Sequence, residues 1–379
     1  MPFSLLADFL HSMRVPFSYL DRQFADVEDY LQDIRALVAS GDFTLGKPLV
    51  EFEQRFAERV GMPFAVGVGT GTDALIMPMK LKGIGPGDEV ITTTMTFYAT
   101  VGAIVATGAR PVLVDSEDGF MIDPAKIEEA ITPKTKAIVT VTFSGNIPDM
   151  TAIAAIAARR DLLIFEDSCQ SIAGEFNGQP MGSWGCAAAY SLHPLKNLNV
   201  WADGGVVVTR DQELNHTLRL YRNHGLINRD EIAMFGINCR LDTIQAVVAN
   251  RLLPQLGDIT NRRIAIAKRY DEAWLDIPDC VRPPVRRPEV KHVFHLYMVR
   301  AKRRDDLLAF LNSHGIEAKI HYPRPIHLQP AAASLGYPKG RFPKAEEDCS
   351  TILTLPAHQH LTEAEIEHVI RTVKTFYGR

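Results

Sequence analysis

The sequence lacks the features that mark secreted, membrane-spanning or metal-scaffolded proteins. Its five cysteines are scattered through 379 residues without a C-x-x-C pair. We therefore expect neither a disulfide framework nor a zinc ribbon, and we expect a reducing, cytoplasmic location. No run approaches the roughly 20 apolar residues that span a bilayer. The briefly apolar start, residues 1–11, lacks a basic leader and contains Asp8, so a signal peptide is not expected.

An excess of one charge is also missing. The formal net charge is only -4, which gives no electrostatic footprint for nucleic acid or for an anionic membrane surface, and neither is expected as a partner. Histidines pair as His292 with His295 and as His358 with His360, but no carboxylate or cysteine completes either set. No metal site is therefore expected.

Between residues 60 and 209, short apolar runs alternate with helical patterns. The expected strands are 64–68, 89–93, 110–114, 137–141, 162–166, 187–191 and 206–209. The expected helices are 73–82, 98–107, 124–130 and 150–159. Because the apolar runs are nearly continuous rather than alternating, the strands are expected to be buried on both faces. This pattern predicts an α/β fold with a mostly parallel sheet.

The flanking regions have other patterns. Residues 23–40 and 48–60 are predicted to be helical, and residues 243–274 to form one long amphipathic helix interrupted at Pro254. Beyond a proline-rich stretch, strands are expected around 295–301 and 317–321, flanking a helix at 305–313. We therefore predict a large domain over residues 1–250 and a smaller α+β domain over residues 251–379.

The first segment suited to chemistry is Val66-Gly-Val-Gly-Thr-Gly-Thr-Asp-Ala-Leu-Ile76, a strand followed by a glycine-rich turn and a helix. Such a helix N-terminus presents free N–H groups to a phosphate. The alternative is a tight turn that Thr72 or Asp73 caps. A dinucleotide site is disfavoured because the glycine spacing is G-x-G-x-G.

The second and third segments carry an acid and a lysine. Asp167 closes an apolar strand in Leu162-Leu-Ile-Phe-Glu-Asp-Ser-Cys-Gln170, where a carboxylate could keep a pyridine nitrogen protonated and Gln170 could donate to a ring oxygen. The alternative is an acid that caps the next helix. Lys196 follows a buried strand beside His193, and desolvation there would favour an uncharged, nucleophilic amine. The alternative is a solvated loop lysine.

In this order, the three segments resemble the DegT/DnrJ/EryC1/StrS family of sugar aminotransferases, which are fold-type I enzymes dependent on pyridoxal 5'-phosphate (PLP). Further matching motifs run from Val15-Pro-Phe-Ser-Tyr-Leu-Asp21 to His327-Leu-Gln329. The resemblance implies a ping-pong transfer of an amino group from glutamate or glutamine to a keto-sugar, often one linked to a nucleotide. Two alternatives are a PLP-dependent sugar dehydratase, whose relatives carry histidine in place of Lys196, and a non-catalytic PLP-binding regulator.

The resemblance also implies roles for individual residues. Lys196 forms the Schiff base and moves the substrate proton, and Asp167 pairs with the pyridine nitrogen. The other implied cofactor contacts are Gly71, Thr72, Phe97, Gln170, Ser191 and Asn238. Of these, Asn238 reaches the phosphate in the neighbouring subunit, which implies a homodimer with shared active sites. The implied substrate contacts are Arg240 for the donor's carboxylate, and His193, His321, Tyr322 and His327 around the sugar.

Two departures from the family pattern lie beside the lysine. Leu195 occupies the position of a usual threonine, which removes a hydroxyl near the phosphate. Asn199-Val-Trp-Ala202 replaces a small, glycine-containing stretch, so a bulkier pocket is expected there. These changes are expected to leave the cofactor chemistry intact, but because of them no particular substrate of the family can be assigned to this protein.

Overall fold

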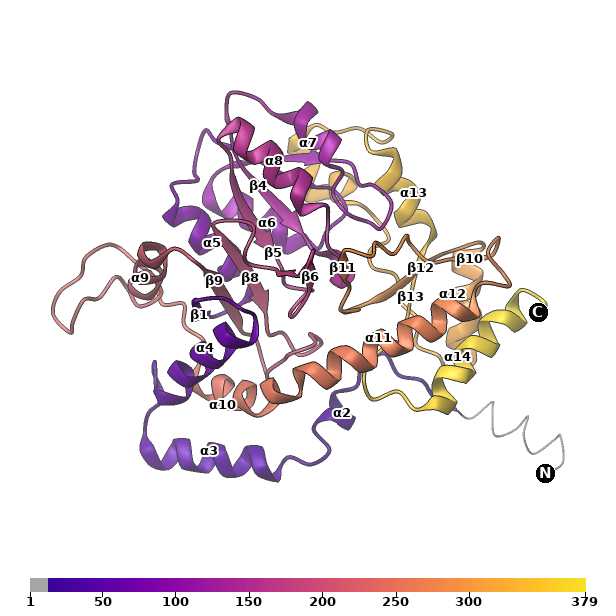
Figure 1. Ribbon diagram of the computed structural model, residues 1–379, viewed down its shortest axis with the longest axis horizontal. Helices are drawn as coiled ribbons and strands as arrows, with labels where there is room; N and C mark the ends of the chain where they lie inside the picture. The colour runs from indigo at the N-terminus through magenta and orange to yellow at the C-terminus, as the bar shows by residue number, and fades with distance from the viewer. Residues whose placement is uncertain (1–12) are drawn as a thin grey trace.

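The computed structural model describes residues 13–379, so the apolar start at residues 1–11 lies outside the described residues. Its centre is a seven-stranded sheet (Figure 1). In spatial order the strands are β1 (Phe64–Val68), β9 (Gly205–Thr209), β8 (Ala187–Ser191), β5 (Leu163–Asp167), β4 (Thr135–Val141), β2 (Glu89–Thr93) and β3 (Arg110–Val114). Only β9 runs against its neighbours in this sheet, which confirms the predicted mostly parallel α/β arrangement.

Helices cover both faces of this sheet. One face carries α4 (Lys47–Arg59), α7 (Pro124–Ala130), α8 (Met150–Arg160) and α10 (Thr243–Leu252). The other face carries α5 (Gly71–Leu81), α6 (Tyr98–Thr107) and α9 (Gln212–Tyr221). Successive strand residues enter opposite cores, as Ala65 and Val66 do. The strands are therefore apolar at nearly every position because both of their faces are buried.

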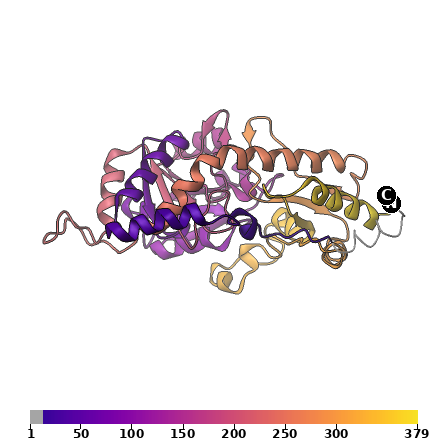
Figure 2. The ribbon, with the colours of Figure 1, turned by 90° about the horizontal axis from the view of Figure 1, so that it is seen from below.

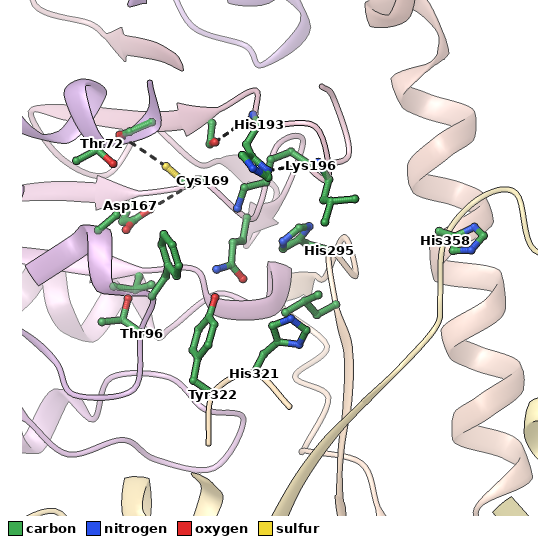
Figure 3. A pocket seen from close by; sticks show the side chains of 18 of the residues that line it. Thr72, Thr96, Asp167, Cys169, His193, Lys196, His295, His321, Tyr322 and His358 are labelled. Atoms are coloured by element: carbon green, nitrogen blue, oxygen red, sulfur yellow. Dashed lines mark hydrogen bonds between the residues drawn. The ribbon is translucent and has the colours of Figure 1, made fainter. Parts of the chain in front are cut away.

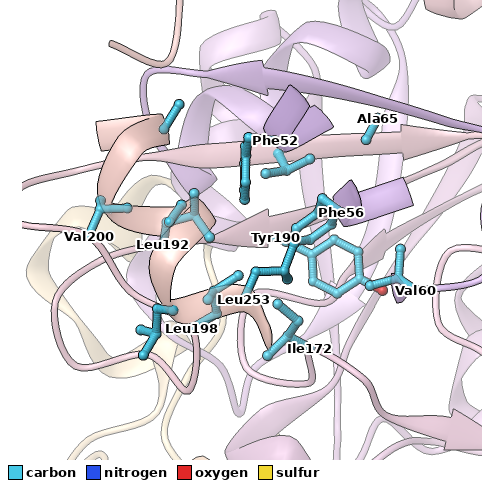
Figure 4. Close-up of a cluster of buried hydrophobic side chains, with 14 of the residues drawn as sticks. Phe52, Phe56, Val60, Ala65, Ile172, Tyr190, Leu192, Leu198, Val200 and Leu253 are labelled. Atoms are coloured by element: carbon cyan, nitrogen blue, oxygen red, sulfur yellow. The ribbon is translucent and has the colours of Figure 1, made fainter. Parts of the chain in front are cut away.

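The core on the α4 and α10 side lies next to the lysine segment. Phe52 and Phe56 from α4 pack with Tyr190 of β8 and with Leu253 (Figure 4). Leu198, from the loop after β8, joins the same core. The loop that carries Lys196 is therefore anchored in a packed core rather than in solvent.

The N-terminal helices differ from the prediction. Residues 23–40 were expected to form one helix, but the structure has α2 (Leu20–Gln23) and α3 (Glu28–Ser40). Between them the chain turns, and Phe24 packs edge-on against Tyr30 and Trp201. The helix break therefore coincides with a tertiary contact, which the 3.6-residue periodicity of the sequence does not indicate.

The predicted long helix is confirmed with its interruption. It consists of α10, a 3-10 turn η2 (Leu253–Gln255) that contains Pro254, and α11 (Leu256–Ala273). The helix α11 runs away from the large sheet toward α14 (Glu363–Phe376) (Figure 2). No helix among the described residues is long and apolar enough to cross a membrane.

The C-terminal region forms its own small sheet and core. The sheet order is β10 (Val281–Arg282), β12 (Tyr297–Ala301) and β13 (Ile352–Leu355), all antiparallel. Helices α12 (Arg304–Ser313), α13 (Pro343–Thr351) and α14 surround it. The remaining short elements are β6 (Glu175–Phe176), β7 (Gln179–Pro180), β11 (Val290–Lys291), η1 (Phe143–Gly145), η3 (Ile326–Leu328) and η4 (Pro330–Leu335).

Two strand predictions in this region were inaccurate. The strand expected at 317–321 is absent, and Lys319 makes only an isolated bridge with Thr354 of β13. The strand expected from residue 295 begins at Tyr297, because the preceding residues turn, with the Phe294 N–H donating to His292 Nδ1. The division of the chain at residue 250 stays a prediction.

Candidate active site

A cavity of about 440 Å³ lies where the large sheet meets the C-terminal region (Figure 3). The large sheet contributes the ends of β5 and β8, at Asp167 and Ser191, and the start of α5, at Gly71. The C-terminal region contributes further wall residues, among them His295 and His321. The cavity is therefore at the carboxyl edge of the parallel strands, the usual ligand position in such folds.

Lys196 lines this cavity from the loop after β8. Its backbone N–H donates to the His193 carbonyl at 2.8 Å. Burial lowers the pKa of its amine, while the nearby Cys169 and Asp167 act in the opposite direction. Burial therefore disfavours the charged form of the amine, which is the direction that favours a nucleophilic lysine. The alternative of a solvated loop lysine does not hold.

Asp167 is 7% exposed and faces the same cavity. Its Oδ2 accepts a hydrogen bond from Thr100 Oγ1 at 2.6 Å, and its Oδ1 accepts one from the Cys169 N–H at 3.2 Å. Residues 168–174 form turns rather than a helix, so the helix-capping alternative is wrong. Thr100 was not among the predicted site residues, because no local pattern indicates its contact with Asp167.

The glycine-rich turn is both a capped turn and part of the cavity wall. Thr70, rather than the expected Thr72 or Asp73, caps α5 by accepting from the Asp73 N–H at 3.0 Å. Gly71 and Thr72 line the cavity at the start of the helix. A Cβ at Gly71 would lie 2.7 Å from Ser191 Cβ, so only glycine allows this close approach.

Four histidines, which are His193, His295, His321 and His358, line the cavity together with Tyr322 and other residues. His193, His321 and Tyr322 were expected there, and His295 was considered only as a metal ligand. Burial lowers the pKa of His321 to about 4 and that of His295 well below its ordinary value. These imidazoles are therefore neutral near pH 7, and each can donate or accept a hydrogen bond.

Phe97 and Gln170 also line the cavity. The Phe97 ring lies 5.8 Å from the Tyr322 ring and is 44% exposed. Gln170 is held in place because its Oε1 accepts from the Ser144 N–H at 2.7 Å. Both residues therefore border the same cavity as Asp167, and their contacts with the cofactor stay a prediction.

Three predicted site residues do not line the cavity formed by residues 13–379. His327 is buried away from it, with Nδ1 2.9 Å from Thr94 Oγ1 and Nε2 3.0 Å from a Glu346 oxygen. Arg240 donates to Asn223 Oδ1 at 2.9 Å, and Asn238 is exposed. Among the described residues, no group of three or more His, Cys, Asp or Glu side chains could hold a metal ion.

Comparison with known proteins connects this geometry to one family. A sequence profile described as the DegT/DnrJ/EryC1/StrS aminotransferase family matches residues 25–374. The chain belongs to this family. Solved structures with a similar fold include one with bound pyridoxamine phosphate (PMP) and one PLP form of an aminotransferase.

Several relatives align with this aminotransferase over almost its whole length. The pleiotropic regulatory protein of Geobacillus stearothermophilus is 39% identical over 96% of this chain and 99% of its own. The dTDP-3-amino-3,4,6-trideoxy-alpha-D-glucose transaminase of Streptomyces venezuelae is 39% identical over 97% of each chain. The crystal structure of S. venezuelae DesV in complex with a ketimine intermediate is 38% identical, covers 97% of this chain and 100% of its own, and has a TM-score of 0.94. The protein is therefore an enzyme, a PLP-dependent sugar aminotransferase.

The cavity's own residues fit PLP. A partly desolvated amine suits the aldehyde, a buried carboxylate suits the pyridine nitrogen, and a helix N-terminus with a serine hydroxyl suits a phosphate. Lys196, Asp167, Gly71 and Ser191 supply these groups within one cavity. The glycine at position 71 lets the start of α5 lie against Ser191, because a Cβ there would collide with the Ser191 side chain. The chemistry of the donor set therefore agrees with the cofactor of the family.

Proposed function

We propose that this aminotransferase transfers an amino group from glutamate or glutamine to the ketone of a nucleotide-linked sugar by a ping-pong mechanism. The observation that carries the proposal is that Lys196 and Asp167 share one cavity of about 440 Å³. The same cavity carries several imidazole and hydroxyl side chains among its apolar lining, and these polar groups can bind the hydroxyls of a sugar.

The chain's own groups have distinct roles in this proposal. Lys196 Nζ would hold the cofactor and, once released, carry the proton between the substrate carbon and the cofactor. Asp167 would hold the ring nitrogen in its protonated form, and Thr100 would keep that carboxylate oriented. The start of α5 and Ser191 would bind the phosphate. When bound, PLP supplies the electron sink that stabilises the substrate carbanion.

The proposed substrate class is supported by what relatives are named for. Relatives at 39% and 37% identity are named as transaminases of dTDP-linked amino sugars, and one at 36% as an aminotransferase of a UDP-linked sugar. The sequence differs from the family beside the lysine, at Leu195 and at residues 199–202. We therefore propose the nucleotide-linked class and no single sugar within it.

A panel of keto-sugars tests this proposal. Free, phosphorylated and nucleotide-linked 3-keto and 4-keto sugars would each be offered with glutamate, with glutamine and with alanine as a donor control. The expected result is an amino sugar formed only from nucleotide-linked ketones, together with 2-oxoglutarate or its amide. Amination of free sugars alone, or water loss without amination, would overturn the proposed substrate class.

We further propose a homodimer with shared active sites. Asn238 and Arg240 lie outside their own chain's cavity. The hairpin of residues 223–238, which follows α9, projects from the body of the molecule (Figure 1). Phe235 in this hairpin is 91% exposed, an unusual position for a phenylalanine unless another chain covers it. Asn238 would thus reach the partner's phosphate site, and Arg240 the partner's donor carboxylate.

Mixing two inactive variants tests the shared site. Lys196→Ala removes the amine, and Asn238→Asp brings a carboxylate near the partner's phosphate. Subunit exchange should produce heterodimers in which one site has both Lys196 and a normal Asn238, so activity should return. If subunits exchange and no activity returns, Asn238 acts within its own chain.

Two broader expectations belong to the same proposal. A division into residues 1–250 and 251–379 is supported by the apolar core that Tyr270, Trp274 and Tyr297 help to form, to which Val15 is the only buried contributor from residues 13–250. A cytoplasmic location is supported by five cysteines that are all free, as a reducing compartment would keep them. Limited proteolysis near residue 250 and fractionation of producing cells would test them.

A further inference from the structure

The segment that departs from the family pattern makes direct contact with the lysine backbone. Asn199 is fully buried, three residues after Lys196. Its Nδ2 donates to the Lys196 carbonyl at 3.0 Å. A buried amide needs partners for both of its ends, so this contact fixes the side chain as well as the carbonyl.

Tyr19 is the second donor to the same carbonyl. Its hydroxyl lies 3.0 Å from the Lys196 oxygen and 3.3 Å from the Leu195 oxygen. The ring is 3% exposed and packs against His358 at 5.1 Å between ring centroids. Because the ring is fixed by packing, the hydroxyl holds a fixed point beside the lysine loop.

A chain of side-chain hydrogen bonds extends from Asn199 to the C-terminal region. Asn199 Oδ1 accepts from Gln23 Nε2 at 2.7 Å, and Gln23 Oε1 accepts from Gln359 Nε2 at 3.0 Å. Gln359 Oε1 in turn accepts from Arg263 Nε at 3.0 Å. We name Arg263, Gln359, Gln23 and Asn199 the amide relay.

The amide relay has only one possible direction. A guanidinium can donate but cannot accept, so Gln359 must present its oxygen to Arg263 and its NH₂ group to Gln23. The same rule then orients Gln23 and Asn199, which leaves the Asn199 NH₂ group facing the Lys196 carbonyl. Arg263 is itself 2% exposed and donates from Nη1 to the carbonyls of Phe294 and His295. The starting point of the relay is therefore rigid.

We infer that Asn199 and Tyr19 are positioning residues for Lys196, and that the amide relay ties the lysine loop to Arg263 on the C-terminal side of the cavity. Because the two donors fix the Lys196 carbonyl, they fix the point from which its side chain extends toward Asp167. The inference rests on the proposed function in one respect, that Lys196 is the lysine that holds the cofactor. Asn199 does not line the cavity that residues 13–379 form, whereas Tyr19 borders it and directs its hydroxyl to the lysine loop.

The position of the Lys196 amine sets the size of the effect that we expect. Displacing a reacting group by about 1 Å can slow a reaction by up to about 100-fold, even when the change is remote from the chemistry. Two donors share one acceptor here, so the loss of one leaves the carbonyl held by the other. The loss of both leaves a buried carbonyl without these partners, and the loop must then shift or admit water.

The test uses three variants and one matched control. Tyr19→Phe removes only the hydroxyl and keeps the ring, Asn199→Leu removes the amide at similar volume, and the third variant combines them. The control is Gln245→Leu, because Gln245 Oε1 accepts from the Trp201 N–H at 3.0 Å and so contacts the same loop outside the amide relay. The first readout is the rate at which cofactor-free protein takes up PLP as a function of pH. The second is the pH midpoint of the bound cofactor's visible absorbance.

Each single variant should take up PLP about tenfold more slowly, with a shifted midpoint, and the double variant should lose more than the product of the two. The control should leave both readouts unchanged. If uptake and midpoint stay as in the wild type while the unfolding temperature falls, the contacts serve packing only and the inference is wrong. Should Asn199→Leu fail to fold, Tyr19→Phe alone decides between these outcomes. PLP uptake needs no sugar or amino donor, so a failure of the proposed substrate class leaves this test intact.

Discussion

Glu166 and Asp167 are neighbouring carboxylates at the end of β5, yet they lie in different surroundings. Glu166 is fully buried against the loop after β7, where its Oε1 accepts from the Trp184 and Gly185 N–H groups at 2.9 and 2.7 Å. Its Oε2 accepts from the Gly182 N–H at 2.6 Å. Asp167 faces the cavity instead and accepts from Thr100.

The difference follows from strand geometry. Successive side chains of a strand point to opposite faces of the sheet. Glu166 therefore binds backbone N–H groups on one face, while Asp167 faces the cavity on the other. All of the Glu166 contacts named above are to backbone N–H groups, whereas Asp167 keeps access to open space. Substitutions at this strand end should therefore separate stability from activity.

The largest effect on activity is expected on the cavity side, from Lys196→Ala. Transamination should fall below detection, because no other lysine lines the cavity that residues 13–379 form. Borohydride reduction of the wild-type holoenzyme followed by peptide mapping should place the pyridoxyl label on Lys196 alone. The variant should unfold at the same temperature or higher, because burial disfavours the charged amine. A label on another lysine would contradict the assignment.

Asp167→Asn should have the next largest effect. The amide keeps an oxygen for the Thr100 hydroxyl but cannot hold a pyridine nitrogen in its protonated form. We expect the half-reaction with the amino donor to slow by about 1000-fold or more while the fold persists. Single-turnover absorbance kinetics would measure this rate. A near-normal rate would mean that the carboxylate serves only the local structure.

Thr100→Val should weaken the cavity side without removing its carboxylate. The hydroxyl that donates to Asp167 at 2.6 Å is lost at nearly constant volume, and about tenfold slower turnover is expected from one charge-assisted hydrogen bond. Thr92→Val is the matched control, because the buried Thr92 hydroxyl donates instead to the Val139 carbonyl at 2.9 Å. If both variants slow turnover equally, loss of a buried hydroxyl in general explains the effect.

Glu166→Gln should have the smallest effect on activity and a clear effect on stability. The new NH₂ group faces a backbone N–H, so the free energy of unfolding should fall by about 1–3 kcal/mol, measured by urea denaturation. Turnover per folded molecule should stay at the wild-type value. A large loss of turnover in fully folded protein would show that the two faces of β5 are not independent.

The pH dependence of this stability difference gives a finer test. Burial raises the pKa of Glu166 from its ordinary value to about 7, so the folded state holds this proton more tightly than the unfolded state does. The associated stability is fully present below about pH 4.5 and is lost as the pH rises toward 7. The difference between wild type and Glu166→Gln should therefore be largest near pH 4 and shrink as the pH rises through about 7. A difference that grows with pH would contradict the raised pKa.

Much of the fold could be predicted because it depends on local patterns. The seven strands predicted between residues 60 and 209 all form, and Pro254, which lacks a backbone N–H, interrupts the long helix. The strand expected at 317–321 was wrong because only Lys319 of this stretch pairs with β13, through one isolated bridge to Thr354. Short strands such as β13 are decided by the partner available to them rather than by their own sequence.

The order of motifs by itself determined the family, the cofactor and the two residues on which the chemistry is proposed to depend. Few sites combine a glycine-rich turn before a helix, an acid at a strand end and a lysine after the next strand. The tertiary structure alone decided that His295 borders the cavity, that His327 does not, and that Thr100 contacts Asp167. It also brought Tyr19 and Gln359, 340 positions apart, into one hydrogen-bonded group with Asn199. Periodicity specifies which face of an element is buried, but long-range packing chooses the partner that covers it.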